Sequence, residues 1–174
     1  FFVACERDCC RQGGQAVAVI LNSGNANAAT GEHGRANARR MCELVAGGLG
    51  CETAEVLVCS TGLIGIPLPM VPIENGVPEL VAALGADEEA GHRAADAILT
   101  TDTVRKEALV VADLTGGPSF HVGGMAKGAA MLSPAMATML AVLVTDAAAE
   151  PAALHGALEH AVADMKGEPI EERS

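Results

Sequence analysis

Residues 15–24, Gln-Ala-Val-Ala-Val-Ile-Leu-Asn-Ser-Gly, give the clearest indication of the fold. The run 15–21 is apolar and rich in β-branched side chains, which is typical of a buried strand. The Asn-Ser-Gly that follows is typical of a tight turn. We expect a loop of small and polar residues up to residue 34 and then a helix over 35–45, which the glycines at 47, 48 and 50 would end.

Strands and helices continue to alternate along the chain, so we predict an α/β fold. The other expected elements are a buried strand over 55–59, helices over 78–84, 87–99 and 151–165, a hairpin of 108–112 with 119–122, and a strand or helix over 138–144. Asp87 is the expected N-cap of its helix. We expect one domain over residues 1–165 and a charged tail over 166–174.

Composition indicates a folded chain with an unusual core. Of 174 residues, 50% are hydrophobic and 19% are charged, which is enough apolar surface for a globular domain. Aromatic residues make up only 2%, so the core must consist of Ala, Val, Leu, Ile and Met. Small side chains bury little area each, and we expect stability to come from extensive contact.

The net charge of −11 argues against binding to nucleic acid or to an anionic membrane. It leaves room for a local cationic pocket for a small acidic substrate, formed by Lys127 or by Arg105 and Lys106. The longest apolar run, 136–144, is too short to span a bilayer. The first four residues lack the basic start of a signal peptide, and we expect a cytoplasmic protein, or an organelle-matrix protein in a eukaryote.

The cysteine and histidine patterns do not favour a metal site. The six cysteines form no Cys-x-x-Cys pair, and we interpret them as small buried apolar groups in a reducing compartment rather than as zinc ligands; they are Cys5, Cys9, Cys10, Cys42, Cys51 and Cys59. His155 and His160 are five apart on a predicted helix, so they do not share a face, and we expect both in solvent.

Two segments combine residues that suit a catalytic site. Ser60-Thr61-Gly62 follows a buried strand, where a backbone N–H of glycine and a threonine hydroxyl could stabilise an oxyanion. Residues 123–128, Gly-Gly-Met-Ala-Lys-Gly, lack the spacing of a phosphate loop, and Lys127 suits a carboxylate anchor better. Taken alone, the simpler interpretations are a capped turn and a surface lysine.

Five ordered segments match the motifs of one family. They are 22–28 (NSGNANA) with Thr30, Gly31 and Gly34; 60–65 (STGLIG) with 68–70; 97–103 (AILTTDT); 123–128 with Met131, Pro134 and 136–140 (MATML); and 145–147. Through these the chain resembles the bifunctional ornithine acetyltransferase/N-acetylglutamate synthase family, from about residue 16 to about residue 162. The resemblance implies a layered α/β sandwich of the ornithine acetyltransferase and self-processing aminopeptidase type, here incomplete.

The resemblance implies that the chain cleaves itself between Ala137 and Thr138. Thr138 would become the first residue of a new chain and contact the substrate. Its hydroxyl would be the nucleophile, and its freed α-amino group, with an ordinary pKa of about 8, would be the base. The product would be a hetero-oligomer of α and β chains made from one precursor.

The remaining site residues are also carried over from the resemblance. Thr61 and Gly62 correspond to the family's oxyanion pair, and Lys127 to a substrate-binding lysine. A substrate-binding threonine falls at Thr101 or at its neighbour Thr100, and we favour Thr101.

The implied reaction moves an acetyl group from N2-acetylornithine to glutamate through an acetyl-threonine, as a step of arginine biosynthesis. No cofactor is expected, although acetyl-CoA is a possible co-substrate. An alternative is an inactive remnant, because the family's second half is missing and Ala130 and Ala135 replace its usual Gly and Asn. A self-processing aminopeptidase is a third possibility, which hydrolysis of short peptides would distinguish.

Overall fold

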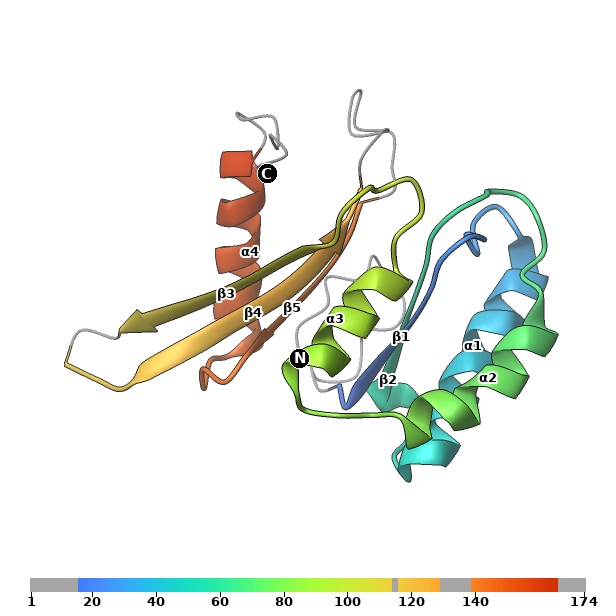
Figure 1. Ribbon diagram of the computed structural model, residues 1–174, viewed down its shortest axis with the longest axis horizontal. Coiled ribbons are helices and arrows are strands. Elements are labelled where there is room, and N and C mark those ends of the chain that lie inside the picture. Colours follow the sequence, from blue (N-terminus) through green and yellow to red (C-terminus); the bar gives the residue numbers. More distant parts are fainter. Residues whose placement is uncertain (1–15, 114–115, 129–138, 166–174) are drawn as a thin grey trace.

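The computed structural model describes residues 16–113, 116–128 and 139–165, and it has two sheets with helices around them (Figure 1). The first sheet has two strands in the order β1-β2, and the second has three in the order β3-β4-β5. This mixture of parallel and antiparallel sheets with helices confirms the predicted α/β class. None of the helices among the described residues is long and apolar enough to cross a membrane.

The first sheet pairs the two strands predicted from apolar runs. β1 (Ala18–Asn22) and β2 (Val56–Ser60) are parallel, with Ala18 opposite Val56 and Asn22 opposite Ser60. A short 3-10 helix, η1 (Thr53–Glu55), leads into β2. Because the strands are parallel, both carboxyl ends lie at the same edge, and the loops that follow them are neighbours.

Helix α1 (Gly31–Leu49) packs its apolar face against this sheet. Met41 is completely buried, and Val45 lies one turn further along the same face. Of the three glycines expected to end the helix, those at 47 and 48 lie inside it and Gly50, with a φ of 72°, ends it, so the helix is longer than predicted. Gly48 belongs to the packing: a Cβ there would lie 3.0 Å from the side chain of Val81 on the next helix.

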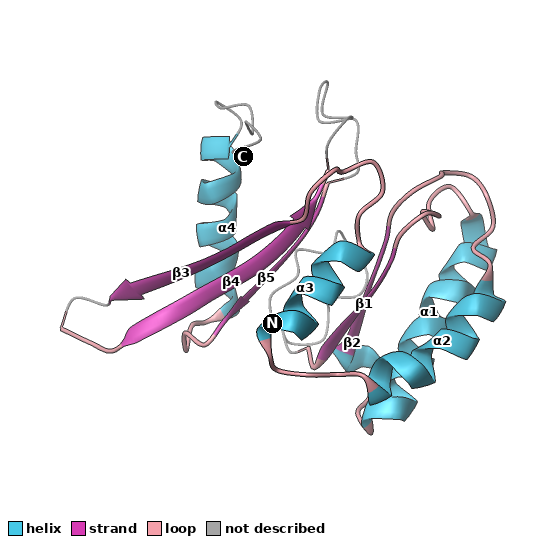
Figure 2. Cartoon of the chain, in the orientation of Figure 1, coloured by secondary structure: helices cyan, strands magenta, loops and turns pink. Residues whose placement is uncertain are grey.

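Helix α2 (Met70–Ala82) starts eight residues before the helix predicted from sequence. An apolar stripe packs on α1 and its neighbours; its members are Met70, Ile73, Val77 and Val81. Pro78 lies inside the helix, where it removes one backbone hydrogen bond. The predicted start at Pro78 was wrong because burial of this stripe outweighs the preference of proline for the first turn of a helix. Figure 2 shows α1 and α2 lying side by side.

The second sheet is an antiparallel meander of β3 (Lys106–Asp113), β4 (Ser119–Lys127) and β5 (Leu140–Thr145). The hairpin predicted for its first two strands is confirmed. β4 is longer than expected, since the predicted strand ends at residue 122 and β4 continues to Lys127. Lys127 is therefore the last residue of a strand, opposite Leu140.

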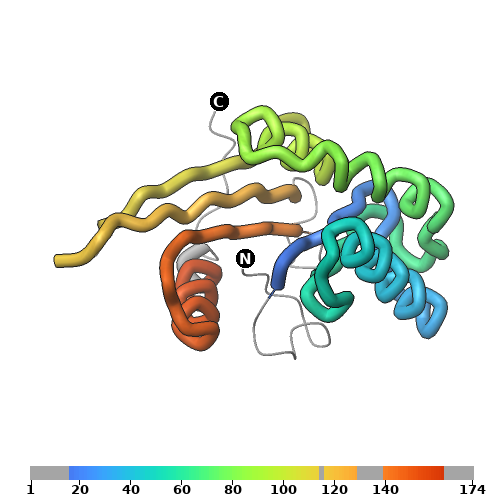
Figure 3. Tube along the Cα trace, turned by 90° about the horizontal axis from the view of Figure 1, so that it is seen from below, coloured from blue at the N-terminus to red at the C-terminus, as the bar shows by residue number. Residues whose placement is uncertain are grey.

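Two further helices flank this sheet. α3 (Glu88–Ala97) begins as predicted at Asp87, whose carboxylate accepts a hydrogen bond from the Ala90 N–H at 2.7 Å. α4 (Pro151–Met165) has the predicted bounds and lies next to β5, away from α1 and α2 (Figure 3). α3 contacts β4 and also the loop after β1, where the Ser23 hydroxyl donates to the Ala97 carbonyl at 2.7 Å. It therefore joins the two sheets.

Candidate active site

Lys127 lies where three distant segments of the chain meet. Its ammonium donates hydrogen bonds to the hydroxyl of Thr61, which follows β2, at 3.1 Å, and to that of Thr100, which follows α3, at 2.6 Å. In Figure 1 the end of β4 and the connection from α3 to β3 come together at one end of the second sheet. Lys127 is only 3% exposed, so it is not the surface lysine of the simpler interpretation.

The charge of Lys127 has no acidic partner among the described residues. Its two hydrogen-bond partners are neutral hydroxyls, and no carboxylate of the described residues lies within 4.0 Å of its Nζ. Buried charges in proteins are normally paired, because removing an ammonium from water costs several kcal/mol. A buried ammonium held by hydroxyls alone is therefore suited to an anionic ligand.

The turn after β2 has a backbone that only glycine fits. Gly62 has a φ of 131°, and a Cβ there would lie 2.2 Å from the backbone carbon of Gly24. Two backbone bonds hold the turn to the loop after β1: Thr61 N–H to Asn22 O at 3.0 Å, and Leu63 N–H to Gly24 O at 3.2 Å. The segment after β2 is thus a turn, as the simpler interpretation holds, and backbone hydrogen bonds to the loop after β1 fix its position.

This turn presents two hydrogen-bond donors. An ammonium can only donate, so the Thr61 oxygen accepts from Lys127, and the Thr61 O–H is free to donate elsewhere. The Gly62 N–H makes no hydrogen bond within the described part of the chain. Thr61 is 1% exposed, which gives its hydroxyl a low-dielectric setting. A hydroxyl and an adjacent N–H of this kind are the groups that stabilise an oxyanion.

The asparagine-rich loop after β1 makes side-chain hydrogen bonds that hold the turn after β2. The Asn22 amide donates to Asn25 O at 2.8 Å and its carbonyl accepts from the Ser60 hydroxyl at 2.7 Å. Asn25 in turn donates to Ile66 O at 3.1 Å. The sequence shows this loop only as a motif, whereas the structure shows that its amides hold the Thr61–Gly62 turn in place.

The connection from α3 to β3 contains a carboxylate that sequence reasoning missed. The Asp102 side chain is fully buried, and its Oδ1 accepts from the Gly128 N–H at 2.7 Å and from Lys106 Nζ at 2.8 Å. Burial by itself would raise the Asp102 pKa, but the hydrogen bond from Lys106, the Gly128 N–H and the Lys106 charge outweigh it and hold the pKa below its usual value. Asp102 is therefore ionised at neutral pH.

The two candidate threonines of this connection differ in their surroundings. The Thr100 hydroxyl accepts the 2.6 Å hydrogen bond from Lys127. Thr101, which the sequence analysis favours, is exposed and makes no hydrogen bond with the described residues. The geometry thus places Thr100, the alternative left open, beside the buried lysine.

Other residues singled out from the sequence lie apart from this cluster or outside the described ranges. Ala137 and Thr138 fall outside the described residues, as do Cys5, Cys9 and Cys10. His155 and His160 are exposed, as expected. Among the described residues no group of three or more His, Cys, Asp or Glu side chains could hold a metal ion.

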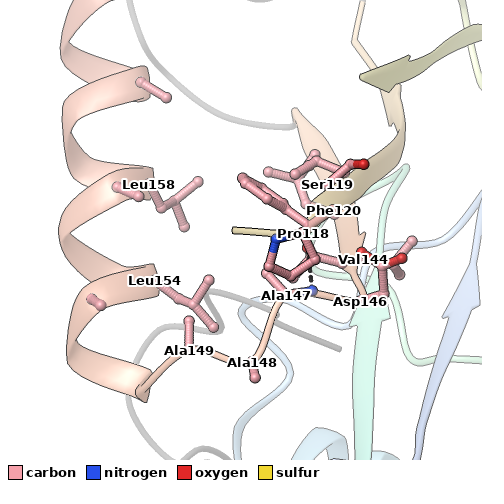
Figure 4. Close-up of a pocket in the computed structure, with 16 residues that line it drawn as sticks. Pro118, Ser119, Phe120, Val144, Asp146, Ala147, Ala148, Ala149, Leu154 and Leu158 are labelled. Carbon is pink, nitrogen blue, oxygen red and sulfur yellow. Dashed lines mark hydrogen bonds between the residues drawn. The ribbon is translucent and has the colours of Figure 1, made fainter. Parts of the chain in front are cut away.

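A cavity of about 660 Å³ lies between α4 and the second sheet (Figure 4). Leu154 and Leu158 of α4 face Phe120 of β4 across it, and its lining is mostly apolar. Asp146 is the charged residue of its rim, which disfavours an acidic ligand. It adjoins the first residues of β4, whereas Lys127 is the last residue of that strand, so the two sites are separate.

Comparison with known proteins identifies the family. The model of the ArgJ family matches residues 2–165, which is most of the chain. The chain belongs to the ArgJ family. Two solved ArgJ-type structures share its fold: the arginine biosynthesis bifunctional protein ArgJ of Bacillus halodurans, with a TM-score of 0.66 and 38% identity over 76% of this chain and 66% of that one, and the ornithine acetyltransferase of Mycobacterium tuberculosis complexed with ornithine, with a TM-score of 0.58 and 40% identity over 70% and 62%.

Curated ArgJ proteins match at higher identity but over part of their length. The arginine biosynthesis bifunctional protein ArgJ of Geobacter sulfurreducens is 53% identical over 135 residues, which cover 77% of this chain and 33% of that protein. The ArgJ protein of Caldanaerobacter subterraneus is 48% identical over 86% of this chain and 36% of its own length. The chain thus spans about a third of the curated relatives that it matches.

Proposed function

We propose that this chain forms part of an acetyltransferase of arginine biosynthesis that moves an acetyl group from N2-acetylornithine to glutamate. The observation that carries the proposal is the buried Lys127, held by two hydroxyls and by no carboxylate of the described residues. Both substrates carry a carboxylate that such an ammonium could bind. Membership of the ArgJ family supports the ornithine half of this reaction, because the ornithine acetyltransferase of Mycobacterium tuberculosis was solved with ornithine.

Each described site residue then has a role. Lys127 binds the substrate carboxylate, and the Thr100 hydroxyl beside it contacts the substrate in place of Thr101. The Thr61 O–H and the Gly62 N–H stabilise the oxyanion, a contribution of about 3–4 kcal/mol in comparable sites. These assignments rest on the contacts of Lys127 and on the fixed geometry of the turn.

The proposed chemistry needs Thr138 as a chain terminus. Cleavage of the 137–138 bond frees an α-amino group, which takes the proton of the Thr138 hydroxyl as its oxygen attacks the acetyl carbon. The amide bond of N2-acetylornithine breaks, and ornithine leaves with the proton. The amino group of glutamate then attacks the acetyl-threonine ester, giving N-acetylglutamate and restoring the hydroxyl. Acetyl-CoA is a second possible donor, whose thioester would acylate the same oxygen.

The test uses a full-length protein that contains this sequence. We expect two chains on a denaturing gel and release of ornithine from N2-acetylornithine in the presence of glutamate. Thr138→Ala should remain one chain and release no ornithine, whereas Thr138→Ser, which keeps a hydroxyl, should still cleave and retain part of the activity. An active, unmutated protein that runs as a single chain would refute the proposed nucleophile.

The alternative of an inactive remnant is tested in the same assay. It is motivated by the short span relative to the family and by Ala130 and Ala135 at positions where the family often has Gly and Asn. We expect no ornithine release from the isolated 174-residue chain. Release of ornithine by this chain alone would eliminate the remnant hypothesis.

A further inference from the structure

Asp102 and Lys106 form a buried ion pair beside the lysine of the proposed site. The carboxylate is fully buried, the Lys106 side chain is 24% exposed, and the two are 2.8 Å apart. The proposed reaction gives neither residue a role. We therefore ask how the pair affects the neighbouring residues Lys127, Gly128 and Thr100.

Asp102 is linked to both residues of the Lys127–Thr100 contact. Its Oδ1 accepts from the N–H of Gly128, the residue after Lys127, and Thr100 precedes it by two residues. One carboxylate thus joins the end of β4 to the turn after α3. Movement of Asp102 would shift both partners of the 2.6 Å hydrogen bond that holds the Lys127 ammonium.

The cluster of Lys127, Asp102 and Lys106 carries more positive than negative charge. It contains two ammonium groups and one carboxylate, and the carboxylate is paired with Lys106 rather than with Lys127. If Lys106 lost its charge, a buried anion would remain near the ligand and would repel a substrate carboxylate. Like charges at close range in a protein interior are strongly unfavourable.

We propose that the Asp102–Lys106 pair is a positioning and charge-balancing device that reserves the positive charge of Lys127 for the substrate carboxylate. In this arrangement Asp102 fixes the backbone at Gly128 while Lys106 cancels its charge. The inference rests on the proposed function, because it assumes that Lys127 binds that carboxylate. It assigns Lys106 to substrate affinity and not to the chemical step.

The experiment compares four variants of the full-length enzyme by the kcat and KM for glutamate and by calorimetric binding of ornithine. Lys106→Gln removes the compensating charge, and Lys106→Arg keeps it. Asp102→Asn/Lys106→Gln removes both charges but leaves an amide oxygen that can accept from the Gly128 N–H. Arg105→Gln is the matched control, since it removes a neighbouring cation that pairs with Asp96 and Glu107 on the exposed side.

We expect Lys106→Gln to raise the KM by about tenfold and weaken ornithine binding to the same extent, with kcat changed by less than about threefold. The double variant should restore the KM to within about threefold of the unmutated enzyme, as should Lys106→Arg. Arg105→Gln should leave the KM unchanged. This rescue by a second substitution is not expected of a purely structural ion pair, whose loss would persist.

The inference is overturned if Lys106→Gln leaves the KM and the ornithine affinity unchanged, or if the double variant is as impaired as the single one. Should Lys106→Gln fail to fold, the comparison of the double variant with Lys106→Arg decides: similar KM values for these two support charge balance, and a KM raised only in the double variant contradicts it. Failure of the proposed function has a different signature, because the unmutated enzyme would then transfer no acetyl group.

Discussion

At the scale of single residues, the site depends on one close approach between two backbones. Gly62 and Gly24 come so near that a single methyl group on Gly62 would overlap the Gly24 peptide. The approach aligns Thr61, whose buried hydroxyl contacts Lys127. The absence of a side chain at position 62 is therefore a conformational requirement, and under the proposed function we expect it to be a catalytic one as well.

Gly62→Ala should disrupt this turn far more than the same change at a nearby glycine. At position 62 a Cβ meets backbone at 2.2 Å and the φ is 131°, so we expect a loss of about 2–4 kcal/mol in stability and a kcat lower by at least about tenfold. Thermal unfolding and kcat of the full-length enzyme measure the two effects.

Gly65→Ala provides the control for this prediction. Gly65 also has a positive φ, 80°, but a Cβ there meets nothing within 4 Å. Only the strain of the left-handed backbone, about 1–2 kcal/mol, should appear, with little change in kcat. Equal effects on kcat at the two positions would contradict the role assigned to the turn.

At the scale of secondary structure, α3 places Thr100 beside Lys127. The helix begins at the Asp87 cap, contacts the loop after β1 through Ser23 and ends three residues before Thr100. Its position thus determines how the turn that contains Thr100 and Asp102 approaches β4. The start of α3 is distant from the proposed chemistry, but we expect its stability to affect the position of Thr100.

Asp87→Ala should loosen the first turn of α3 by about 1 kcal/mol, because the Ala90 N–H loses its capping partner and the helix dipole loses a negative charge. Hydrogen exchange of the α3 amides in the full-length protein should become about fivefold faster. Asp113→Ala is the matched control, since the exposed Asp113 ends a strand and caps no helix. An exchange rate for α3 that Asp87→Ala leaves unaltered would refute the cap's contribution.

The helices and strands also differ in how far they could be predicted from the sequence. β1, β2, α3 and α4 were predicted because apolar runs, an N-cap and Pro151 act within a few residues. Only the last part of α2 was predicted, as a helix over 78–84, because the burial of its apolar stripe against α1 is a tertiary effect that the local sequence does not show; the stripe is Met70, Ile73, Val77 and Val81. The predicted strand likewise ends before Gly123 and Gly124, although pairing with β3 and β5 continues β4 through them.

The candidate site was only partly predictable for a related reason. Thr61, Gly62 and Lys127 could be named from motifs, but a motif says nothing about which hydroxyls surround the lysine. The contacts of Lys127 with Thr61 and Thr100 and the hydrogen bond from Gly128 to Asp102 join residues 26 to 66 positions apart and depend on how the two sheets meet. The assignment of Thr138 stays a prediction, since it lies outside the described residues.

At the scale of the whole molecule, the second sheet is incompletely covered. Leu109, Val110 and Val111 are consecutive in β3 and are each more than half exposed, although they point to alternate faces. A strand with exposed aliphatic groups on both faces is unfavourable in water. Because the chain spans about a third of its curated relatives, we expect the rest of a full-length protein to pack on this sheet.

In the proposed reaction the hydroxyl oxygen of Thr138 takes the acetyl group from N2-acetylornithine, whose carboxylate Lys127 binds. The most direct test of this reaction is mass spectrometry of the full-length protein after incubation with N2-acetylornithine and without glutamate. We expect one acetyl group on a peptide that begins at Thr138, and its removal when glutamate is added. An acetyl group on another residue, or transfer at full rate by a protein in which the 137–138 bond is intact, would contradict it.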